Sequence, residues 1–428
     1  MNLTKQFFKY VSQNILGMIG FSCYVLADSY FISIAKGADG LTALNLVMPL
    51  YSIIFSIGEM IGVGSAIRYA ISKIKKDADA DDYFWNALIW CILSSMLFVF
   101  AGIFFSADIM RVLGADEHIV AVGNNYTKIF MCFAPMFMCN YVTNAFVRND
   151  GAPGIAMSAT LFSSLFNIVF DYILMFPMNL GMEGAALATA LSPIIGMGIC
   201  SIHFFSKKSS VRLVVCKPSV RKLVAGCQLG VSAFVGEMSS AVITLAFNFV
   251  ILKLAGNVGV AAYGVVANIA IVTTAVFNGV AQGSQPLISS CFGRGDKDGC
   301  TQLKRMGYTT AFVLAAVMYS ILFIFAGQFV AVFNSEGSEM LRLYATEGVK
   351  LYFIGIFFAG INIVGGGAFS ATEDAFKAAV VSVARGFVLI LGAVFVMSAF
   401  FGMTGVWLAY AVAEGITTFI MLVMAMRV

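Results

Sequence analysis

Twelve apolar segments, each long enough to cross a lipid bilayer, follow one another along the chain of 428 residues. A spanning helix needs about 20 consecutive, mostly apolar residues. The gaps between the segments are short, and only 11% of the residues are charged, whereas soluble proteins carry roughly a quarter. The pattern predicts an all-α membrane protein with twelve transmembrane helices in the lipid bilayer. The predicted spans are residues 11–34, 41–71, 84–106, 119–147, 154–176, 184–206, 226–254, 259–291, 305–330, 344–371, 377–400 and 403–427.

Lysine and arginine residues in the gaps indicate the orientation of the chain. If the N-terminus is cytoplasmic, twenty of the 26 lie on the cytoplasmic side, including Arg148, Arg385 and Arg427. We therefore predict a multi-pass protein of the plasma membrane with both termini in the cytoplasm. The basic residues are scattered among apolar runs, which argues against a nucleic-acid partner. The most basic gap, residues 207–225, is interpreted as a linker or, alternatively, as an amphipathic helix on the inner leaflet.

An internal repeat relates the two halves of the chain, at an offset of 219 residues that drifts to 221–223. Six spans in each half give both copies the same orientation, as in transporters whose substrate path lies between the halves. We predict two pseudo-symmetric six-helix lobes, residues 1–206 (N-lobe) and 226–428 (C-lobe), joined by a cytoplasmic linker of residues 207–225. Matching positions include Gly37 and Gly256, Gly64 and Gly283, Ala145-Phe146 and Ala368-Phe369, and Gly181 and Gly402.

A few carboxylates lie inside the predicted spans, whereas seventeen of the 22 fall in gaps or at span ends. An ionisable group inside the membrane costs roughly 2.5–3.5 kcal/mol or more, so its default interpretation is functional. No lysine or arginine is expected at comparable depth. Buried carboxylates without a fixed cation are protonated or bind a mobile one, as a proton or sodium relay requires. The five are Asp28, Glu59, Asp171, Glu237 and Glu414.

A cation-coupling site is predicted at Asp28, Asn167, Asp171 and Thr189. Counting 1.5 Å per residue places Asp28, Asp171 and Thr189 within one helical turn of a common depth. Asn167 precedes Asp171 by four residues and shares its helix face. These side chains supply the oxygen ligands of a Na⁺ ion, and the carboxylates can equally carry H⁺. The alternative is that Asn167 and Thr189 only make hydrogen bonds between helices.

The second half has no carboxylate at the positions equivalent to Asp28 and Asp171. Ion coupling is therefore predicted to reside in the N-lobe. Glu59 and Glu237 are placed to contact a cationic substrate or to take part in gating, with a structural hydrogen bond as the alternative. Glu414 receives no role. The substrate-binding or gating candidates are Glu59, Met131, Met138, Glu237 and Gln282.

Methionine and phenylalanine cluster around Pro135, which interrupts its helix and permits a bend. Adaptable, polarizable side chains such as Met131 and Met138 suit a pocket for varied apolar cations. Contact with lipid or ordinary packing is the alternative. The sequence contains no HExxH, GxSxG or P-loop motif, which predicts that the chain is not an enzyme and uses an ion gradient as its energy source.

Nine cysteines are scattered singly, without a CxxC pair. This spacing suggests neither a disulfide framework nor a zinc site. We expect a secondary active transporter that works as a monomer without a cofactor, its coupling ion being Na⁺ or H⁺.

Four motifs resemble those of the multidrug and toxic compound extrusion (MATE) family. The resemblance covers the whole chain and implies two six-helix lobes and sodium- or proton-coupled antiport of small organic, often cationic, drugs. It also implies that Asp28, Asn167, Asp171 and Thr189 form an N-lobe cation site, as in the DinF-like branch. The motifs are Asn167-Ile-Val-Phe-Asp171-Tyr-Ile-Leu, Gly181-Met-Glu-Gly184-Ala-Ala, Gly283-Ser-Gln-Pro286 and Gly293-Arg-Gly-Asp296.

The chain departs from the family pattern in two places. Glu237 matches an acidic position of the seventh span that other branches use in coupling, but the carboxylate of their tenth span is absent, which argues against a C-lobe ion site. Many relatives carry a proline near the inner end of the first span. Here the segment Val11-Ser-Gln-Asn14 has none, so a proline-driven bend of that helix is not implied.

Two alternative functions fit the sequence less well. A flippase for a lipid-linked precursor, from the same superfamily, would need more than twelve spans or a basic central cavity, and the embedded charges here are acidic. A non-transporting receptor or channel would usually build its pore from rings of repeated subunits. The acids confined to one half fit that arrangement poorly.

Overall fold

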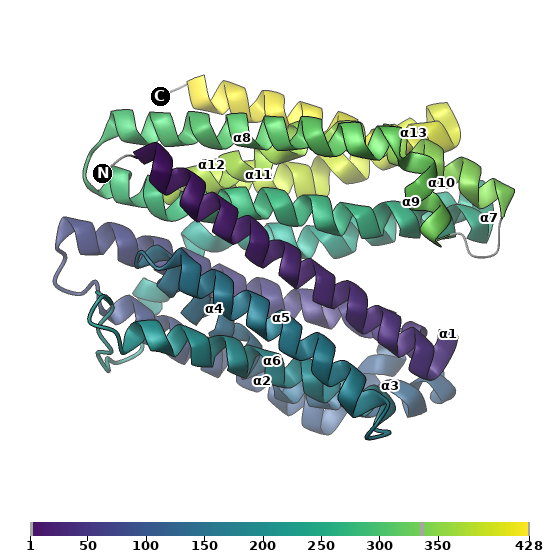
Figure 1. Cartoon of the computed structure of the whole chain (residues 1–428), viewed down its shortest axis with the longest axis horizontal. Coiled ribbons are helices and arrows are strands. Elements are labelled where there is room, and N and C mark those ends of the chain that lie inside the picture. Colours follow the sequence, from purple (N-terminus) through teal and green to yellow (C-terminus); the bar gives the residue numbers. More distant parts are fainter. Residues whose placement is uncertain (1–2, 334–337, 427–428) are drawn as a thin grey trace.

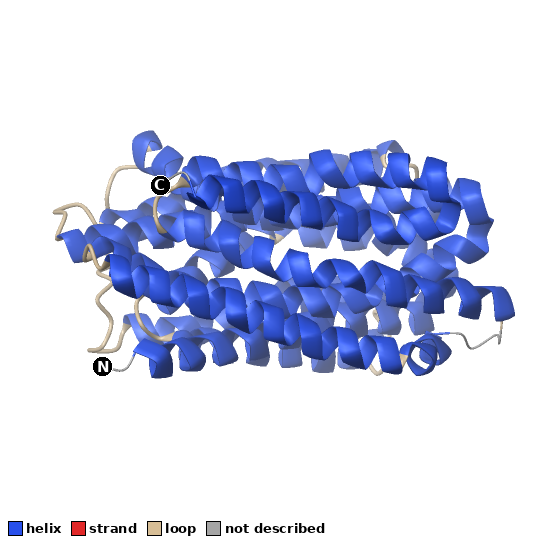
Figure 2. Ribbon diagram, turned by 90° about the horizontal axis from the view of Figure 1, so that it is seen from above, coloured by secondary structure: helices blue, strands red, loops and turns tan. Residues whose placement is uncertain are grey.

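The computed structural model describes residues 3–333 and 338–426, and these ranges contain helices and loops but no strand. Arg427 lies outside the described residues. The helices form two groups along one long axis, and both chain termini lie at the same end of the bundle, called here the terminal end (Figures 1 and 2). The elements are α1 (Leu3–Lys75), α2 (Asp82–Val112), α3 (Glu117–Cys132), α4 (Ala134–Asn149), α5 (Pro153–Met175), α6 (Gly181–Phe204), α7 (Val220–Gly293), α8 (Lys297–Ile324), α9 (Ala326–Phe333), α10 (Glu339–Tyr352), η1 (Phe353–Gly355), α11 (Ile356–Ala371), α12 (Ala375–Val383), η2 (Ala384–Val388) and α13 (Leu389–Met426).

These elements make twelve crossings within the described ranges, which confirms the predicted number. Three of the elements contain a hairpin turn, at Gly37 in α1, Gly256 in α7 and Gly402 in α13. Their φ angles of 59°, 62° and 56° are accessible to glycine at little cost. Helices α3 and α4 form one crossing that bends by 46°. The bend directly precedes Pro135, as expected of a residue without a backbone N–H.

Backbone turns with positive φ recur at the intervals of the sequence repeat. The offsets between paired turns are 219–222 residues. Non-glycine residues rarely adopt positive φ. Lys76 and Glu373 nevertheless do so, at positions whose equivalents in the other copy of the repeat are glycines. The turn geometry is therefore retained even where the residue has changed. The pairs are Gly37 and Gly256, Lys76 and Gly295, Gly151 and Glu373, and Gly181 and Gly402.

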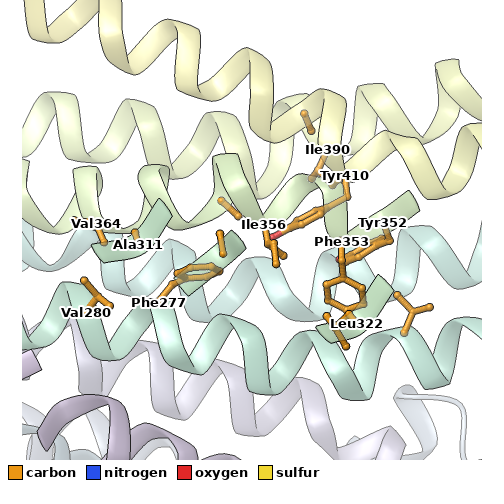
Figure 3. Packing of buried hydrophobic residues seen from close by; sticks show 14 of the residues in the cluster. Phe277, Val280, Ala311, Leu322, Tyr352, Phe353, Ile356, Val364, Ile390 and Tyr410 are labelled. Carbon is orange, nitrogen blue, oxygen red and sulfur yellow. The ribbon is translucent and has the colours of Figure 1, made fainter. Parts of the chain in front are cut away.

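Each half of the described chain packs around an apolar core. The core of the C-half (α7–α13) includes Phe277 and Phe353 (Figure 3), and that of the N-half (α1–α6) includes Phe130. Phe7, from the start of α1, packs in the C-half core, and Leu229, from the start of α7, packs in the N-half core. The N-terminal parts of α1 and α7 therefore cross between the halves, and Figure 1 shows α1 running diagonally over the boundary.

Close backbone contacts join the two halves toward the terminal end. A Cβ atom added to Gly230 would lie 2.0 Å from the carbonyl oxygen of Met60, and one added to Gly64 would lie 2.0 Å from that of Gly226. Small residues allow such approach between helices. We call these contacts between α1 and α7 the glycine seam. A second line of contacts packs Gly279 and Gly283 of α7 against Ile15 and Val11 of α1.

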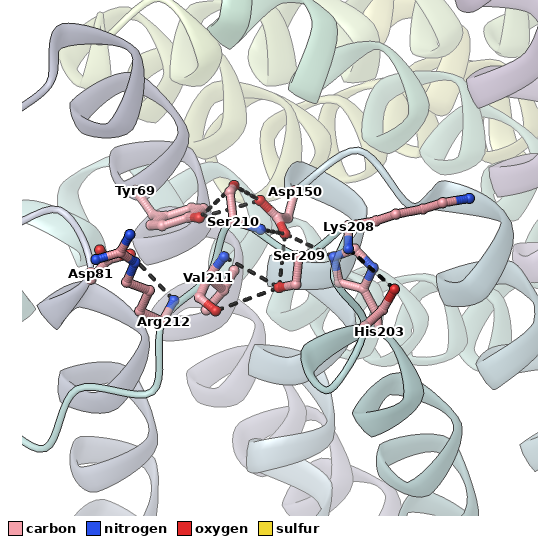
Figure 4. Close-up of polar contacts among 10 residues, drawn as sticks. Tyr69, Asp81, Asp150, His203, Lys208, Ser209, Ser210, Val211 and Arg212 are labelled. Carbon is pink, nitrogen blue, oxygen red and sulfur yellow. Dashed lines mark hydrogen bonds and ion pairs between the residues drawn. The ribbon is translucent and has the colours of Figure 1, made fainter.

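The connection between the halves has no helix from residue 209 to residue 219, so the alternative prediction of an amphipathic helix is wrong. Its start is held by Asp150, a buried carboxylate that accepts hydrogen bonds from the Ser210 backbone N–H at 2.8 Å and from Ser209 Oγ at 3.2 Å (Figure 4). His203 Nε2 lies 2.8 Å from the same carboxylate. This polar anchoring replaces helical hydrogen bonds, so the segment lies on the N-half in an extended form.

Candidate functional site

Three of the four predicted cation-coupling residues form a hydrogen-bonded cluster between α5 and α6. Asn167 and Asp171 share one face of α5, and Thr189 faces them from α6; all three are buried. When the Asn167 amide nitrogen faces Asp171, it donates to Oδ2 at 3.1 Å, and the amide oxygen accepts from Thr189 N at 3.2 Å and Oγ1 at 3.1 Å. We assign this orientation because it satisfies both neighbours. Asn167 and Asp171, four residues apart, therefore lie on one face of the helix, as their spacing predicts.

Asp28 approaches this cluster from α1. Gly20 of α1 packs tightly on Leu161 of α5, and one turn beyond Asp28 the ring of Phe31 lies 6.2 Å from that of Tyr172. This pairing brings Asp28 to the level of Asp171, and the two carboxyl groups interact electrostatically. All four predicted residues are thus gathered in one region of the N-half.

Neither carboxylate has a fixed positive partner in the described part of the chain. No lysine, arginine or histidine nitrogen there lies within 4.0 Å of Asp28 or Asp171. The Oδ1 atoms of both residues are buried and have no hydrogen-bond partner among the described residues. A buried carboxylate in this position is neutralised by a proton or binds a mobile cation. The site has the chemistry to carry either.

A cavity of about 220 Å³ lies between the halves, beside this cluster. Glu59, Glu237 and Gln282 line it, as expected of substrate-binding or gating candidates. Ser164 also lines it, and this residue is one turn before Asn167 on α5. The cavity wall and the acidic cluster are therefore joined by a single helix.

Met131 and Met138 do not line this cavity, in contrast to the prediction. Both are buried in the N-half core, where Met138 packs against Gly58. The cavity face of the fourth crossing is a different one. A sequence signal for that face exists, because polar residues recur along it every four residues. They are Asn140, Asn144 and Arg148.

Arg148 is a site residue that the sequence interpretation assigned to the cytoplasmic margin. Its Nη1 donates to Gln282 Oε1 at 2.7 Å, and Gln282 Nε2 donates to Glu59 Oε1 at 3.2 Å. Arg148 lies on α4, Glu59 on α1 and Gln282 on α7. This chain of hydrogen bonds, all of whose members line the cavity, therefore links the N-half to the C-half.

The prediction that the embedded carboxylates have no basic partner at their depth is wrong for Glu414, which forms an ion pair with Arg385. Arg385 Nη2 donates to Glu414 Oε1 at 2.6 Å, and Asn362 Nδ2 donates to Oε2 at 2.7 Å. Arg385 lies ten residues beyond the start of α12, well inside its crossing. The repeat equivalents at an offset of 222 residues are Ser163 and Ser192, which also contact each other, at 2.6 Å.

We expect Glu414→Gln to destabilise the protein by about 3–5 kcal/mol, because Arg385 would remain buried without its counterion. Replacing both residues by apolar ones, Arg385→Met with Glu414→Leu, should recover most of that loss. Thermal unfolding in detergent measures both effects. If the single and double variants unfold at the wild-type temperature, the ion pair contributes no stability.

The sequence model of the MatE family matches residues 14–173 and 233–396, one block in each half. Among curated relatives, the multidrug export protein MepA of Staphylococcus aureus (strain MRSA252) is 27% identical over 405 residues, covering 92% of this chain and 87% of the relative. MepA of Staphylococcus saprophyticus is 26% identical over 400 residues, with the same coverage.

Solved structures share the fold at low sequence identity. One described as the outward-facing conformation of a multidrug resistance MATE family transporter of the MOP superfamily has a TM-score of 0.93 at 20% identity, covering 100% of this chain and 96% of that one. A MOP superfamily transporter from Pyrococcus furiosus has a TM-score of 0.92, with the same identity and coverage. These structures show the same fold, and the family match, which covers most of the chain in one block per half, shows that the chain belongs to the MatE family of membrane transporters.

Proposed function

We propose that this protein exports small organic molecules, mainly cationic, across the plasma membrane in exchange for Na⁺ or H⁺. The observation that carries the proposal is the buried pair Asp28 and Asp171, without a fixed cation among the described residues, beside a cavity that two further acids line. MepA, a relative that matches most of the chain, is named a multidrug export protein. The family match supports transport, and the acids support a cationic coupling ion.

Alternating access is the proposed mechanism, with residues 1–206 and 226–428 acting as the two lobes. The excess of basic residues supports placing both termini in the cytoplasm. With this orientation the glycine seam lies on the cytoplasmic side, and we propose that it closes that side while the cavity opens to the outside. Export requires the seam to part so that substrate can enter from the cytoplasm.

Coupling between ion and substrate follows from the position of α5. This helix carries Asn167 and Asp171 inside the N-half and presents Ser163 and Ser164 to the cavity. Binding of a cation at Asp28 and Asp171 would change the charge behind the cavity wall and the packing of α5. We propose that this change favours release of a cationic substrate outward, since the coupling ion and the substrate are both attracted by the same acidic region.

Dye efflux from proteoliposomes tests the proposal. Ethidium, a permanent organic cation, is enclosed in liposomes that contain the purified protein. An inward gradient of Na⁺ or of H⁺ is then imposed in separate experiments. We expect one gradient to drive efflux and its collapse by the matching ionophore to stop it. Protein-free liposomes supply the background. Efflux that is independent of both gradients would contradict ion-coupled antiport.

A further inference from the structure

A second hollow lies on the surface of the C-half and shares no lining residue with the cavity between the halves. Its walls come from both crossings of α7, on either side of Gly256, and from the part of α13 that precedes Gly402. The described residues that line it carry no charge, and most are apolar. Several are well exposed, among them Leu245 at 64%, Phe249 at 53% and Phe395 at 49%. We call this hollow the lateral groove.

The two walls of the lateral groove reach equal depths in the membrane. Leu245 and Leu391 each lie eleven residues before the turn glycine of their own element. Phe249 and Phe395 each lie seven residues before it, and both turns are at the end of the bundle opposite the terminal end (Figure 1). At about 1.5 Å per residue the two pairs are about 16 and 10 Å from the turns, and one leaflet contributes about 15 Å of hydrocarbon. The groove therefore spans about one leaflet, the depth of the acyl chains of one phospholipid.

Two amide side chains are set into this apolar surface. Asn248 is half-buried within the crossing, Asn257 follows the turn at Gly256, and neither side chain makes a hydrogen bond to a described residue. An amide without a partner is costly in hydrocarbon, so both can bind polar groups that come from outside the chain. The position equivalent to Asn248 in the first half holds Ser29, whose hydroxyl donates to the carbonyl oxygen of Val25 at 3.2 Å. The N-half thus satisfies this position within its own helix, and the C-half does not.

Lys253 supplies a positive charge at the mouth of the groove. Side chains of a helix lean toward its N-terminus, and Lys253 Nζ lies 4.1 Å from the ring centre of Phe249, a groove residue one turn earlier. Lys253 is exposed and has no ion-pair partner within 4.0 Å in the described part of the chain. The equivalent residue of the first half is Ile34. The repeated scaffold therefore does not require a cation at this position.

We propose that the lateral groove binds one anionic phospholipid, with an acyl chain between α7 and α13 and the phosphate on Lys253. The chain matches the apolar walls, the ester carbonyls can accept hydrogen bonds from Asn248, and the phosphate can pair with the free ammonium group. A zwitterionic head group would bring its own cation beside Lys253, and no carboxylate lines the groove to receive it. With both termini in the cytoplasm, the lipid belongs to the outer leaflet. The site does not depend on the proposed export function.

Quenching of a tryptophan in the groove tests this assignment. Phe395→Trp places the probe on one wall, and the parent protein, with its three native tryptophans, gives the background to be subtracted. The full-length protein is reconstituted in phosphatidylcholine bilayers that contain either brominated phosphatidylglycerol or brominated phosphatidylcholine, whose bromines quench tryptophan on contact. We expect phosphatidylglycerol to occupy the groove with about fivefold higher affinity, the effect of one lysine near a membrane surface. Adding Lys253→Gln should bring the two affinities to within about twofold of each other.

Lys350→Gln is the matched control, because Lys350 also lies over a phenylalanine ring, that of Phe323 at 5.1 Å, but outside the groove. It should leave the preference for phosphatidylglycerol unchanged. Equal quenching by both brominated lipids in the Phe395→Trp protein would overturn the site. So would a preference that survives Lys253→Gln, or one that Lys350→Gln abolishes to the same extent. The measurement needs no transport, so a protein that exports no dye but keeps the Lys253-dependent preference contradicts export and supports the lipid site.

Discussion

Replacing Asp171 by Asn is expected to reduce gradient-driven dye export at least about 100-fold, the consequence of losing an interaction with a charged group worth roughly 3 kcal/mol. An amide has nearly the same shape as a carboxylate and can still form a hydrogen bond with Asn167, which lies 3.1 Å from Asp171 Oδ2. The local packing of α5 should therefore survive. The variant loses only the negative charge and the capacity to exchange a proton, so the loss would report coupling rather than folding.

Asp108→Asn is a suitable control, because it removes a carboxylate that is exposed and paired with Arg111 outside the site. Efflux of ethidium from proteoliposomes should be near the wild-type level in this variant. Expression and thermal unfolding of Asp171→Asn should match the wild type. Full efflux by Asp171→Asn would exclude this carboxylate from the coupling mechanism.

Features that depend on one helix, or on depth alone, were predictable from the sequence. Asn167 and Asp171 lie on one face because residues four apart in a helix are neighbours. Asp28 and Thr189 reach the same level because the helix rise is constant at about 1.5 Å per residue. The turn glycines Gly37 and Gly402 could be located because they recur in both copies of the repeat.

The rotation of each helix about its own axis could not be predicted in the same way. Met131 and Met138 lie on either side of the bend between α3 and α4, and nothing in their spacing says whether they meet the cavity or the core. The polar series Asn140, Asn144 and Arg148 contains that information, since polar groups inside a membrane protein face its interior or a water-filled cavity.

The two arginines of the site were misplaced for a related reason. The rule that assigns basic residues to the cytoplasmic margin treats every arginine as a surface group. Arg385 instead lies inside its crossing, where Glu414 compensates its charge. Arg148 is buried near a helix end, and amides from other helices surround it. Partners from distant segments therefore decide the depth at which an arginine is tolerated.

Gly230→Val is the second variant with a large expected effect, because it should prevent closure of the glycine seam. The Cβ position on Gly230 is 2.0 Å from the carbonyl oxygen of Met60 and 2.9 Å from its Cα. These are backbone atoms of a packed helix, so they cannot move aside as a flexible side chain would. Two further methyl groups make the conflict larger. Alternating access fails if one of its two states is inaccessible, and we expect export to fall to the level of protein-free liposomes.

A cysteine introduced at Ser65, in a background without the nine native cysteines, reports the state of the seam. Ser65 is 2% exposed, and its Oγ lies 2.6 Å from the Cβ position of Gly226, so the introduced thiol should react slowly with a maleimide in the closed state. Gly230→Val should raise that reaction rate severalfold. Gly264→Val, in the second crossing of α7 with no atom within 4 Å of its Cβ position, should change neither the rate nor export. Normal export by Gly230→Val, together with a slowly reacting thiol at position 65, would contradict this prediction. It would mean that the transport cycle does not require the seam to open and close.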